Sequence, residues 1–448
     1  MSTQASPATP RTTDREPGAP APGRQLALLS SLIAMDNSEA GVASVMFPMV
    51  RTALGLPLSA LGLLVAVSRV AGIVAGPLWL SALRRFSRKS LLAVCGAFSG
   101  GWTVAAGLGQ NLPQLVVLLS LAAVGVAGAG PLVNGLLVDL YDDRARGRAA
   151  GALYGAAALI SAVVGPLLGQ LTRVHDGWRY GFFASGAVQL LGAALVLLFL
   201  RDPGVGAAEP QLASVGGSAG TTSLSWARSR QLIAVPTLRV LLIQRLTNGQ
   251  FVLQISGVVL LVDGFGFSNA LASTVILPAG LAFLLGTYLG GMLTDRVHRR
   301  HPRNGRLVLL QAGLLAYAAV AYPATQIAWH SIGAYAALFS VLGLLQGLNP
   351  GINRPLVASV VVPELRNAAF ALMLSSEMVC TALTSLGVGY LADALGIRAA
   401  FLWFVVVLTL ANGLLVSLFY RTYQHDAAAL QAELDRRQAE QTEQAEQG

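Results

Sequence analysis

The sequence predicts an all-α polytopic membrane protein with twelve transmembrane helices, arranged as two six-helix bundles with pseudo-twofold symmetry along the membrane normal. Two observations come from composition and hydropathy. Hydrophobic residues make up 54% of the 448 positions and charged residues only 11%, whereas a soluble domain carries about 25% charged residues. Apolar windows of about 20 residues, the length needed to cross a bilayer, recur along the chain. The third observation is a polar stretch that divides these windows six and six.

The spans follow in order along each half. In the first half they are expected at 26–50, 58–82, 90–109, 113–138, 149–171 and 181–200. In the second half they are expected at 238–262, 270–293, 307–327, 332–358, 368–391 and 398–420. The corresponding domains are a disordered cytosolic tail (1–24), an N-terminal bundle (25–200), a cytosolic linker (201–236), a C-terminal bundle (237–420) and a cytosolic C-terminal tail (421–448). The first segment lacks an apolar core, so we expect a tail rather than a cleaved signal.

The positions of the basic residues predict the orientation. Sixteen arginines and lysines fall in loops on one side of the expected membrane and four on the other. Because basic loops stay in the cytosol, both termini are expected there, in a multi-pass protein of the cell membrane. The net charge of +9 then reflects topology, and no nucleic-acid partner is expected.

The lysine and cysteine counts exclude several kinds of site. Lys89 is the one lysine of the chain, and it lacks the glycines of a phosphate-binding P-loop. Cys95 and Cys380 form no C-x-x-C pair, so neither a metal nor a disulfide is expected. We expect no cofactor and no enzymatic activity, and a proton gradient as the energy source. The expected partners are a small-molecule substrate, protons and the lipid bilayer, with the protein a monomer.

The two halves resemble each other. Pro131 and Asn134 in the fourth span match Pro350 and Asn353 in the tenth, and an inner loop with Arg146 or Arg366 follows each pair at nearly the same distance. The repeat is therefore parallel. Parallel halves with a site between them at mid-depth are typical of secondary transporters.

The segment "GGMLTDRVHRR" after the eighth span resembles the loop signature of the major facilitator superfamily. The matching positions are Gly291, Asp295, Arg296, Arg299 and Arg300, with His298 where the family has a second glycine. The first-half copy, "LSALRRFSRKS", keeps Arg85, Arg88 and Lys89 but has Leu80 for the glycine and Arg84 for the aspartate. The resemblance implies that these loops, with Arg146 and Arg366, help to lock the two bundles in one orientation.

Three further segments resemble the same superfamily. "DDRARGRAAG" is similar to its loop between spans four and five, and "GWRYGFF" to its entry into span six. "GPLLGQ" resembles the proline-glycine motif of span five in drug/proton antiporters, with Gln170 for the final glycine. "RDPGVGAAEP" and the Trp102–Thr103 pair resemble the lipid-associated Spinster branch, although Asp36–Asn37 stands where that branch has Asp-Arg.

Ionisable residues deep inside spans are costly and mark functional sites. Asp36, Glu39, Arg69 and Glu377 are the predicted substrate- or proton-coupling residues. Because all five histidines lie in loops or at span ends, carboxylates are expected to carry the protons. Arg69 is expected near Glu377 or near the Asp36/Glu39 pair. The alternative is a static ion pair that only fixes packing.

Other polar side chains are expected along the cavity, with helix–helix hydrogen bonding as the alternative for each amide. They are Asn37, Asn134, Gln244, Asn248, Gln250, Gln254, Asn349, Asn353, Arg354 and Thr381. Arg245 and Arg354 lie toward the cytosolic third, where an arginine side chain can also extend to the interface.

The sequence favours a proton-coupled exporter of an amphipathic or drug-like compound that works by alternating access. One alternative is proton-coupled uptake of an organic anion, bound by Arg69, Arg245 and Arg354. An alternative of another class is an intramembrane enzyme or a sensor that does not transport. The lack of an intramembrane histidine or metal cluster argues against hydrolytic chemistry.

Overall fold

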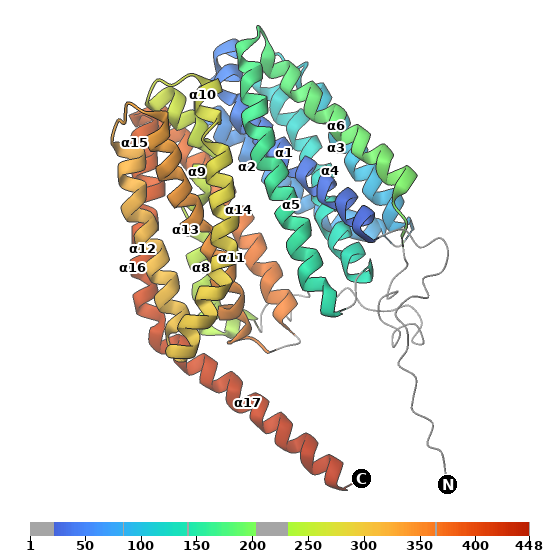
Figure 1. The fold of residues 1–448 in the computed structure, drawn as a ribbon, viewed down its shortest axis with the longest axis vertical. Coiled ribbons are helices and arrows are strands. Elements are labelled where there is room, and N and C mark those ends of the chain that lie inside the picture. The colour runs from blue at the N-terminus through green and yellow to red at the C-terminus, as the bar shows by residue number, and fades with distance from the viewer. Residues whose placement is uncertain (1–21, 84, 141–142, 203–231, 363–364, 448) are drawn as a thin grey trace, which may run out of the picture.

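A computed structural model shows an all-helical chain in two halves (Figure 1). It describes residues 22–83, 85–140, 143–202, 232–362 and 365–447, and the side chains at 33–41 and 143–151 are among those outside the description. Nine of the described helical segments are long and apolar enough to cross a membrane, beside the shorter apolar helices Val42–Leu54 and Gly155–Gln170. The predicted twelve-helix fold class is confirmed.

The helices of the first half follow the expected spans closely. They are α1 (Pro22–Leu54), α2 (Ser59–Ala82), α3 (Arg88–Ala106), α4 (Leu112–Leu140), α5 (Asp143–Gln170), the short η1 (Leu171–Arg173) and α6 (Gly177–Phe199). Side chains set some of the ends. Ser87 caps α3 by accepting a hydrogen bond from the backbone N–H of Ser90 at 3.1 Å, as N-cap serines do.

The second half contains more interruptions. Its helices begin with α8 (Pro236–Leu246), α9 (Gln250–Val259), η2 (Leu260–Gly264), α10 (Asn269–Ser273), α11 (Ile276–Arg300) and α12 (Gly305–Gln326). They continue with α13 (Ile332–Ala358), α14 (Arg366–Leu395), α15 (Ile397–Phe401), η4 (Leu402–Val407), α16 (Leu408–Val416), η5 (Ser417–Phe419) and α17 (Tyr420–Gln447). Gly396, at φ 89°, separates α14 from α15, a backbone angle that glycine adopts readily.

The seventh span is broken, although the sequence predicted one continuous helix over 238–262. The chain leaves helical geometry at Thr247–Gly249, between α8 and α9. Asn412 of α16, only 1% exposed, donates to the carbonyls of Gln244 at 2.9 Å and Thr247 at 3.4 Å. A Cβ at Gly249 would collide with the carbonyl oxygen of Phe404. The break is therefore held by residues far away in sequence, and its free backbone groups are satisfied inside the protein.

Close helix contacts hold the second half together. Gly343, Gly347 and Gly351 recur every fourth residue on α13 and face the backbone of α11 at Ala279, Phe283 and Gly290. Such small-residue faces let helix backbones approach closely in a membrane.

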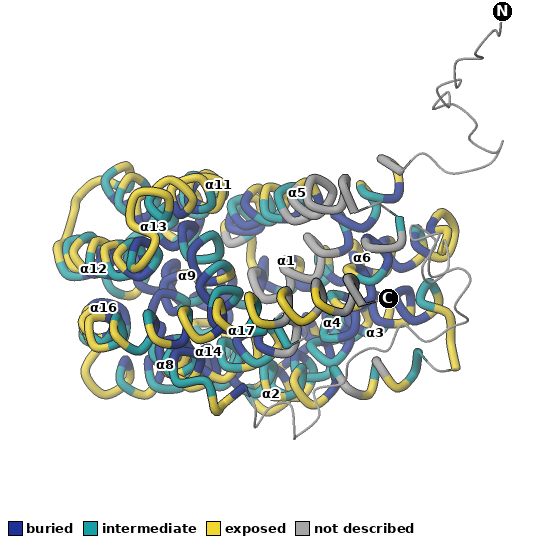
Figure 2. The backbone as a smooth tube through the Cα atoms, turned by 90° about the horizontal axis from the view of Figure 1, so that it is seen from below, coloured by how far each residue is buried: buried dark blue, intermediate teal, exposed yellow. Residues whose placement is uncertain are grey.

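The buried core shows how the halves meet. We call the end with the connections after α2, α11 and α13 the inner end, and the opposite end the outer end. One large apolar cluster includes residues of both halves, such as Phe47 and Trp178 with Val252 and Phe401. Two further clusters stay within one half each, around Leu29 and Leu92 in the first and around Leu238 and Leu356 in the second. Figure 2, seen from the inner end, shows the halves side by side.

The C-terminal helix begins as part of the second half. Tyr423 is 2% exposed, and the Asp426 carboxylate accepts a hydrogen bond from the backbone N–H of Thr237 at 2.7 Å. Beyond these first turns α17 projects away from the bundle (Figure 1).

Candidate functional site

The two halves are joined at the outer end. Arg51 at the end of α1 pairs with Asp263 of η2 at 2.7 Å, and Asn269 donates to the carbonyl of Val45 at 2.8 Å. Asp393 of α14 accepts hydrogen bonds from the N-terminus of α2. Gln170 also donates to the carbonyl of Ala270 at 3.4 Å, so several hydrogen bonds and an ion pair between the halves lie at this end.

Small residues bring the helices of the two halves into contact there. Gly62 of α2 packs against the backbone of Ser385 on α14, and Gly389 of α14 packs against Ser59. Gly169 of the "GPLLGQ" segment packs against Ser273. A side chain at any of these glycines would push the halves apart. Two other glycines of α2 make no such contact among the described residues: a Cβ at Gly76 would meet no atom within 4 Å, and one at Gly72 would meet only α4 loosely.

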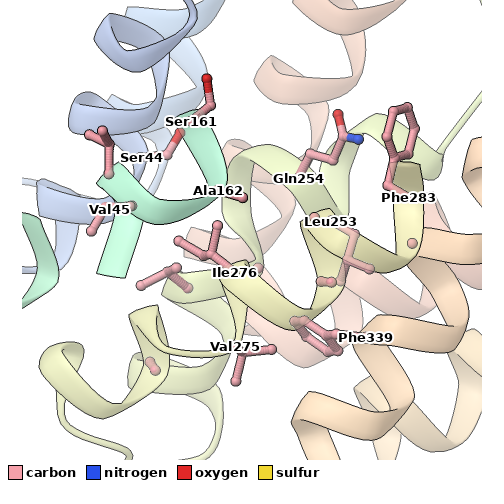
Figure 3. A pocket seen from close by; sticks show the side chains of 18 of the residues that line it. Ser44, Val45, Ser161, Ala162, Leu253, Gln254, Val275, Ile276, Phe283 and Phe339 are labelled. Atoms are coloured by element: carbon pink, nitrogen blue, oxygen red, sulfur yellow. The ribbon is translucent and has the colours of Figure 1, made fainter. Parts of the chain in front are cut away.

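A cavity lies between the halves. It has a volume of about 400 Å³, within the range of drug-sized binding pockets. Figure 3 shows Ser44, Val45, Ser161 and Ala162 of the first half on one side, and Gln254, Phe283 and Phe339 of the second on the other. With the outer contacts closed and separate cores at the inner end, the described part of the chain is arranged to face inward.

The chemistry of the cavity is mostly apolar. Among the described residues, its polar side chains are Ser44, Ser161, Gln254 and Gln346, and none of its lining residues is ionisable. The Ser161 hydroxyl is buried and makes no hydrogen bond within the described chain. These groups can hydrogen-bond an uncharged polar group on an otherwise apolar ligand.

Sequence reasoning found one of these cavity residues and missed the others. Of the ten expected cavity amides and other polar residues, Gln254 lines the cavity. Gln346 lies one turn before the predicted Asn349, so the polar face of span ten gave a usable signal. The serines and the two phenylalanines carry no signal that separates them from ordinary packing residues.

A mid-depth ion pair joins α8 to α14. Nη2 of Arg245 lies 2.7 Å from Oε2 of Glu377, with the side chains 15% and 26% exposed. At about 1.5 Å per residue, Arg245 lies about 14 Å above the start of α8 and Glu377 about 16 Å above the start of α14. The pair is thus at one depth, beside the break in the seventh span and nearer the inner end than Gln254.

This pair corrects the sequence-based assignment of partners. Glu377 was expected near Arg69, and Arg245 was considered able to extend to the interface; instead these two pair with each other. Arg69 is half-buried on α2. Asp36, Asn37 and Glu39 lie on α1, but their side chains are outside the described ones, so the alternative placement of Arg69 beside them stays a prediction.

Most of the remaining predicted polar residues hydrogen-bond within the second half. Asn349 donates to Oε1 of Gln250 at 2.7 Å, and Oδ1 of Asn248 accepts from the Gln250 backbone at 3.1 Å. Thr381 donates to the carbonyl of Glu377 at 2.8 Å. Asn353 and Gln244 are buried and retain polar atoms without a partner among the described groups. Arg354 is exposed, and Asn134, in the first half, donates to the carbonyl of Gly130 at 3.0 Å.

The predicted lock residues lie at the inner end. Gly291, Asp295, Arg296, Arg299 and Arg300 belong to the last turns of α11 rather than to a loop. Arg88 pairs with Asp202 at 2.5 Å within the first half, and Arg366 donates to the carbonyl of Val361 at 3.3 Å within the second. Arg85 is exposed and Lys89 half-exposed, and the side chain of Arg146 lies outside the description.

The chain is similar in sequence to a known family and to known transporters. The model of the Major Facilitator Superfamily matches residues 27–329. "Multidrug resistance protein 1" of Bacillus subtilis is 28% identical over 158 residues, which cover 35% of this chain and 40% of that protein. The "Probable 4-methylmuconolactone transporter" of Cupriavidus pinatubonensis is 27% identical over 173 residues, 38% of this chain and 39% of that protein. The chain thus spans about two fifths of the length of these relatives.

Solved structures share the fold. A bacterial homolog of the human lysosomal transporter Spinster, in an inward-facing and occupied conformation, matches with a TM-score of 0.73 and 17% identity, covering 92% of this chain and 98% of that one. A D-xylose-proton symporter matches with a TM-score of 0.67 and 18% identity, covering 88% and 96%.

Proposed function

The chain belongs to the Major Facilitator Superfamily, and from that premise we propose that it is a secondary transporter which exports an uncharged amphipathic compound in exchange for protons. It works by alternating access between its two halves. Both termini lie in the cytosol of a cell whose membrane the protein spans. The proton gradient supplies the energy, and no cofactor takes part.

The Arg245–Glu377 pair is the observation that carries the proposal. A carboxylate at mid-depth can bind a proton, and its protonation removes the partner of a guanidinium that is only 15% exposed. An unpaired charge at that depth is costly, so Arg245 must then find another partner. The break between α8 and α9 lies immediately beside Arg245 and gives that part of the seventh span a place to bend.

The cavity supports the substrate class. The described residues of its walls are apolar apart from two serines and two glutamines, which suits a neutral molecule with one or two hydrogen-bonding groups. The inward-facing arrangement allows such a compound to enter from the cytosolic leaflet or the cytosol. A multidrug resistance protein among the relatives favours the same class.

We propose that Asp36, Glu39 and Arg69 contribute to coupling as well, since three ionisable residues in two helices of the first half are costly in a bilayer.

We also propose a role for the charged end of α11. Asp295, Arg296 and their neighbours there engage the first half only when the inner end closes. Their exposure in an inward-facing chain agrees with this.

The direction of the driving gradient tests the function. Purified protein is reconstituted in proteoliposomes, and uptake of radiolabelled chloramphenicol, a neutral amphipathic probe, is measured with either an acidic or an alkaline lumen. Because an antiporter moves its substrate against the proton flow in either orientation, we expect accumulation with the acidic lumen. Accumulation only with the alkaline lumen would refute antiport, and protein-free liposomes are the control.

Uptake of an organic anion by symport is the second candidate. The pairing of Arg245 with a carboxylate favours it, because a guanidinium released from Glu377 can bind the carboxylate of a substrate. In the same assay, this candidate predicts that benzoate, and not chloramphenicol, accumulates in an alkaline lumen well above the passive accumulation in protein-free liposomes.

A further inference from the structure

Asp393 bonds to the N-terminus of a helix in the other half. Its Oδ1 accepts a hydrogen bond from the backbone N–H of Leu58 at 2.7 Å, and its Oδ2 accepts one from the backbone N–H of Ser59 at 3.0 Å. Leu58 and Ser59 begin α2, whereas Asp393 lies near the end of α14. One carboxylate of the second half therefore caps a 24-residue helix of the first.

The first half supplies no cap of its own for α2. Leu58 at the N-cap position makes no side-chain hydrogen bond, and the first turn of α2 has no acidic residue. The first N–H groups of a helix have no partner within the helix, and the partial positive charge there favours a carboxylate. Asp393 meets both needs.

The cap can exist only while the outer end is closed. Gly389, one turn before Asp393, packs against Ser59. Ser385, two turns before Asp393, packs against Gly62. If the halves rock open at the outer end, α2 and α14 must separate there, and the N–H groups of Leu58 and Ser59 then meet water instead of a carboxylate. The contact stabilises the inward-facing state and contributes nothing to the outward-facing one.

We infer that Asp393 is a positioning residue that sets which way the cavity faces, by capping α2 in one of the two states. A group that interacts with one state only shifts the equilibrium by its full contribution. Removing an N-cap costs about 0.5–2 kcal/mol, so loss of Asp393 is expected to raise the outward-facing population about 2- to 30-fold, since about 1.4 kcal/mol corresponds to a factor of ten. The inference rests on the rocking of the proposed function, but not on its substrate or on protons.

The test measures how often the outer end opens. In a background without Cys95 and Cys380, Ser161→Cys places a thiol in the cavity. Its alkylation by a membrane-impermeant maleimide added outside intact cells is proportional to the outward-facing population. We expect Asp393→Ala to raise that rate about 2- to 30-fold, and Asp393→Asn, which keeps one acceptor oxygen but no charge, to raise it less.

Two controls make the result specific. Glu440 pairs with Arg436 within the exposed part of α17, so Glu440→Gln should leave the rate unchanged. His175 is fully exposed in an outer loop. The variant His175→Cys therefore reports any change in the labelling reaction that does not depend on the opening of the cavity. Equal rates for the parent, Asp393→Ala and Asp393→Asn proteins would overturn the inference, as would an equal rise for Glu440→Gln. Because no substrate or gradient is used, this outcome is independent of the proteoliposome assay.

Discussion

Arg245 and Glu377 illustrate how a charge is kept at mid-depth in an apolar chain. Each is largely removed from water, and each neutralises the other at a distance that allows a charge-assisted hydrogen bond. Thr381 and Cys380 lie about one turn after Glu377 on α14. Thr381 donates to the carbonyl of Glu377, and Cys380 donates to the carbonyl of Asn248 in the break of the seventh span. This face of α14 therefore contacts both the ion pair and the break.

The pair predicts a non-additive effect on stability. Arg245→Met alone or Glu377→Met alone leaves one charge without its partner and should lower the free energy of unfolding by about 1.5–3 kcal/mol, the range for hydrogen bonds to charged groups. The double variant removes both charges and should lie closer to wild type. Thermal unfolding in detergent measures all four proteins. Equal and additive losses would show that the two side chains do not interact.

At this scale the sequence identified most of the charged positions but not their neighbours. The depth of a residue follows from its distance to the span end, and Glu377 was recognised as deep in this way, whereas Arg245 was placed nearer the cytosolic end than its pairing with Glu377 indicates. The direction in which a side chain points around the helix axis depends on the packing of all twelve helices, which hydropathy does not specify. The sequence therefore singled out Glu377 as a deep carboxylate but did not predict that Arg245 is its partner.

At the scale of the helix, α11 and α13 depend on glycine. A Cβ at Gly347 would meet the carbonyl oxygen of Phe283 and the N–H of Thr287, both of them backbone atoms that cannot move separately from their helix. The broken seventh span depends on distant residues in the same way, through Asn412 and the backbone of Phe404. The sequence predicted the span and not the break, because the partners of Gly249 lie more than one hundred residues further along the chain.

Gly347→Ala is expected to destabilise the second half by about 1–3 kcal/mol, the usual cost of overpacking. Gly313→Ala is the matched control, since Gly313 lies in α12 with no atom within 4 Å of the added Cβ. That change should be neutral or stabilise the helix by up to about 1 kcal/mol. Thermal unfolding temperatures compare the two, and an unaffected Gly347→Ala protein would argue against the close α11–α13 contact.

At the scale of the whole molecule, the two halves pack against each other at the outer end, whereas each half has its own separate core at the inner end. Inter-half contacts at Arg51, Asn269 and Asp393 close one side of the cavity, and the apolar cores around Leu92 and Leu356 remain separate on the other. The sequence predicted two halves from the repeat around Pro131 and Pro350. It could not predict which end is closed, because both states use the same helices and differ only in how the halves tilt.

If protonation of Glu377 drives the exchange between these states, as proposed above, then Glu377→Gln should uncouple transport from the proton gradient. The variant keeps the size of the side chain and removes the titrating carboxylate. In proteoliposomes with an acidic lumen, it should fail to accumulate chloramphenicol above the external concentration, yet still exchange labelled for unlabelled chloramphenicol. Glu440→Gln, in the exposed part of α17, should accumulate the probe as wild type does. Accumulation by Glu377→Gln at the wild-type level would contradict the account.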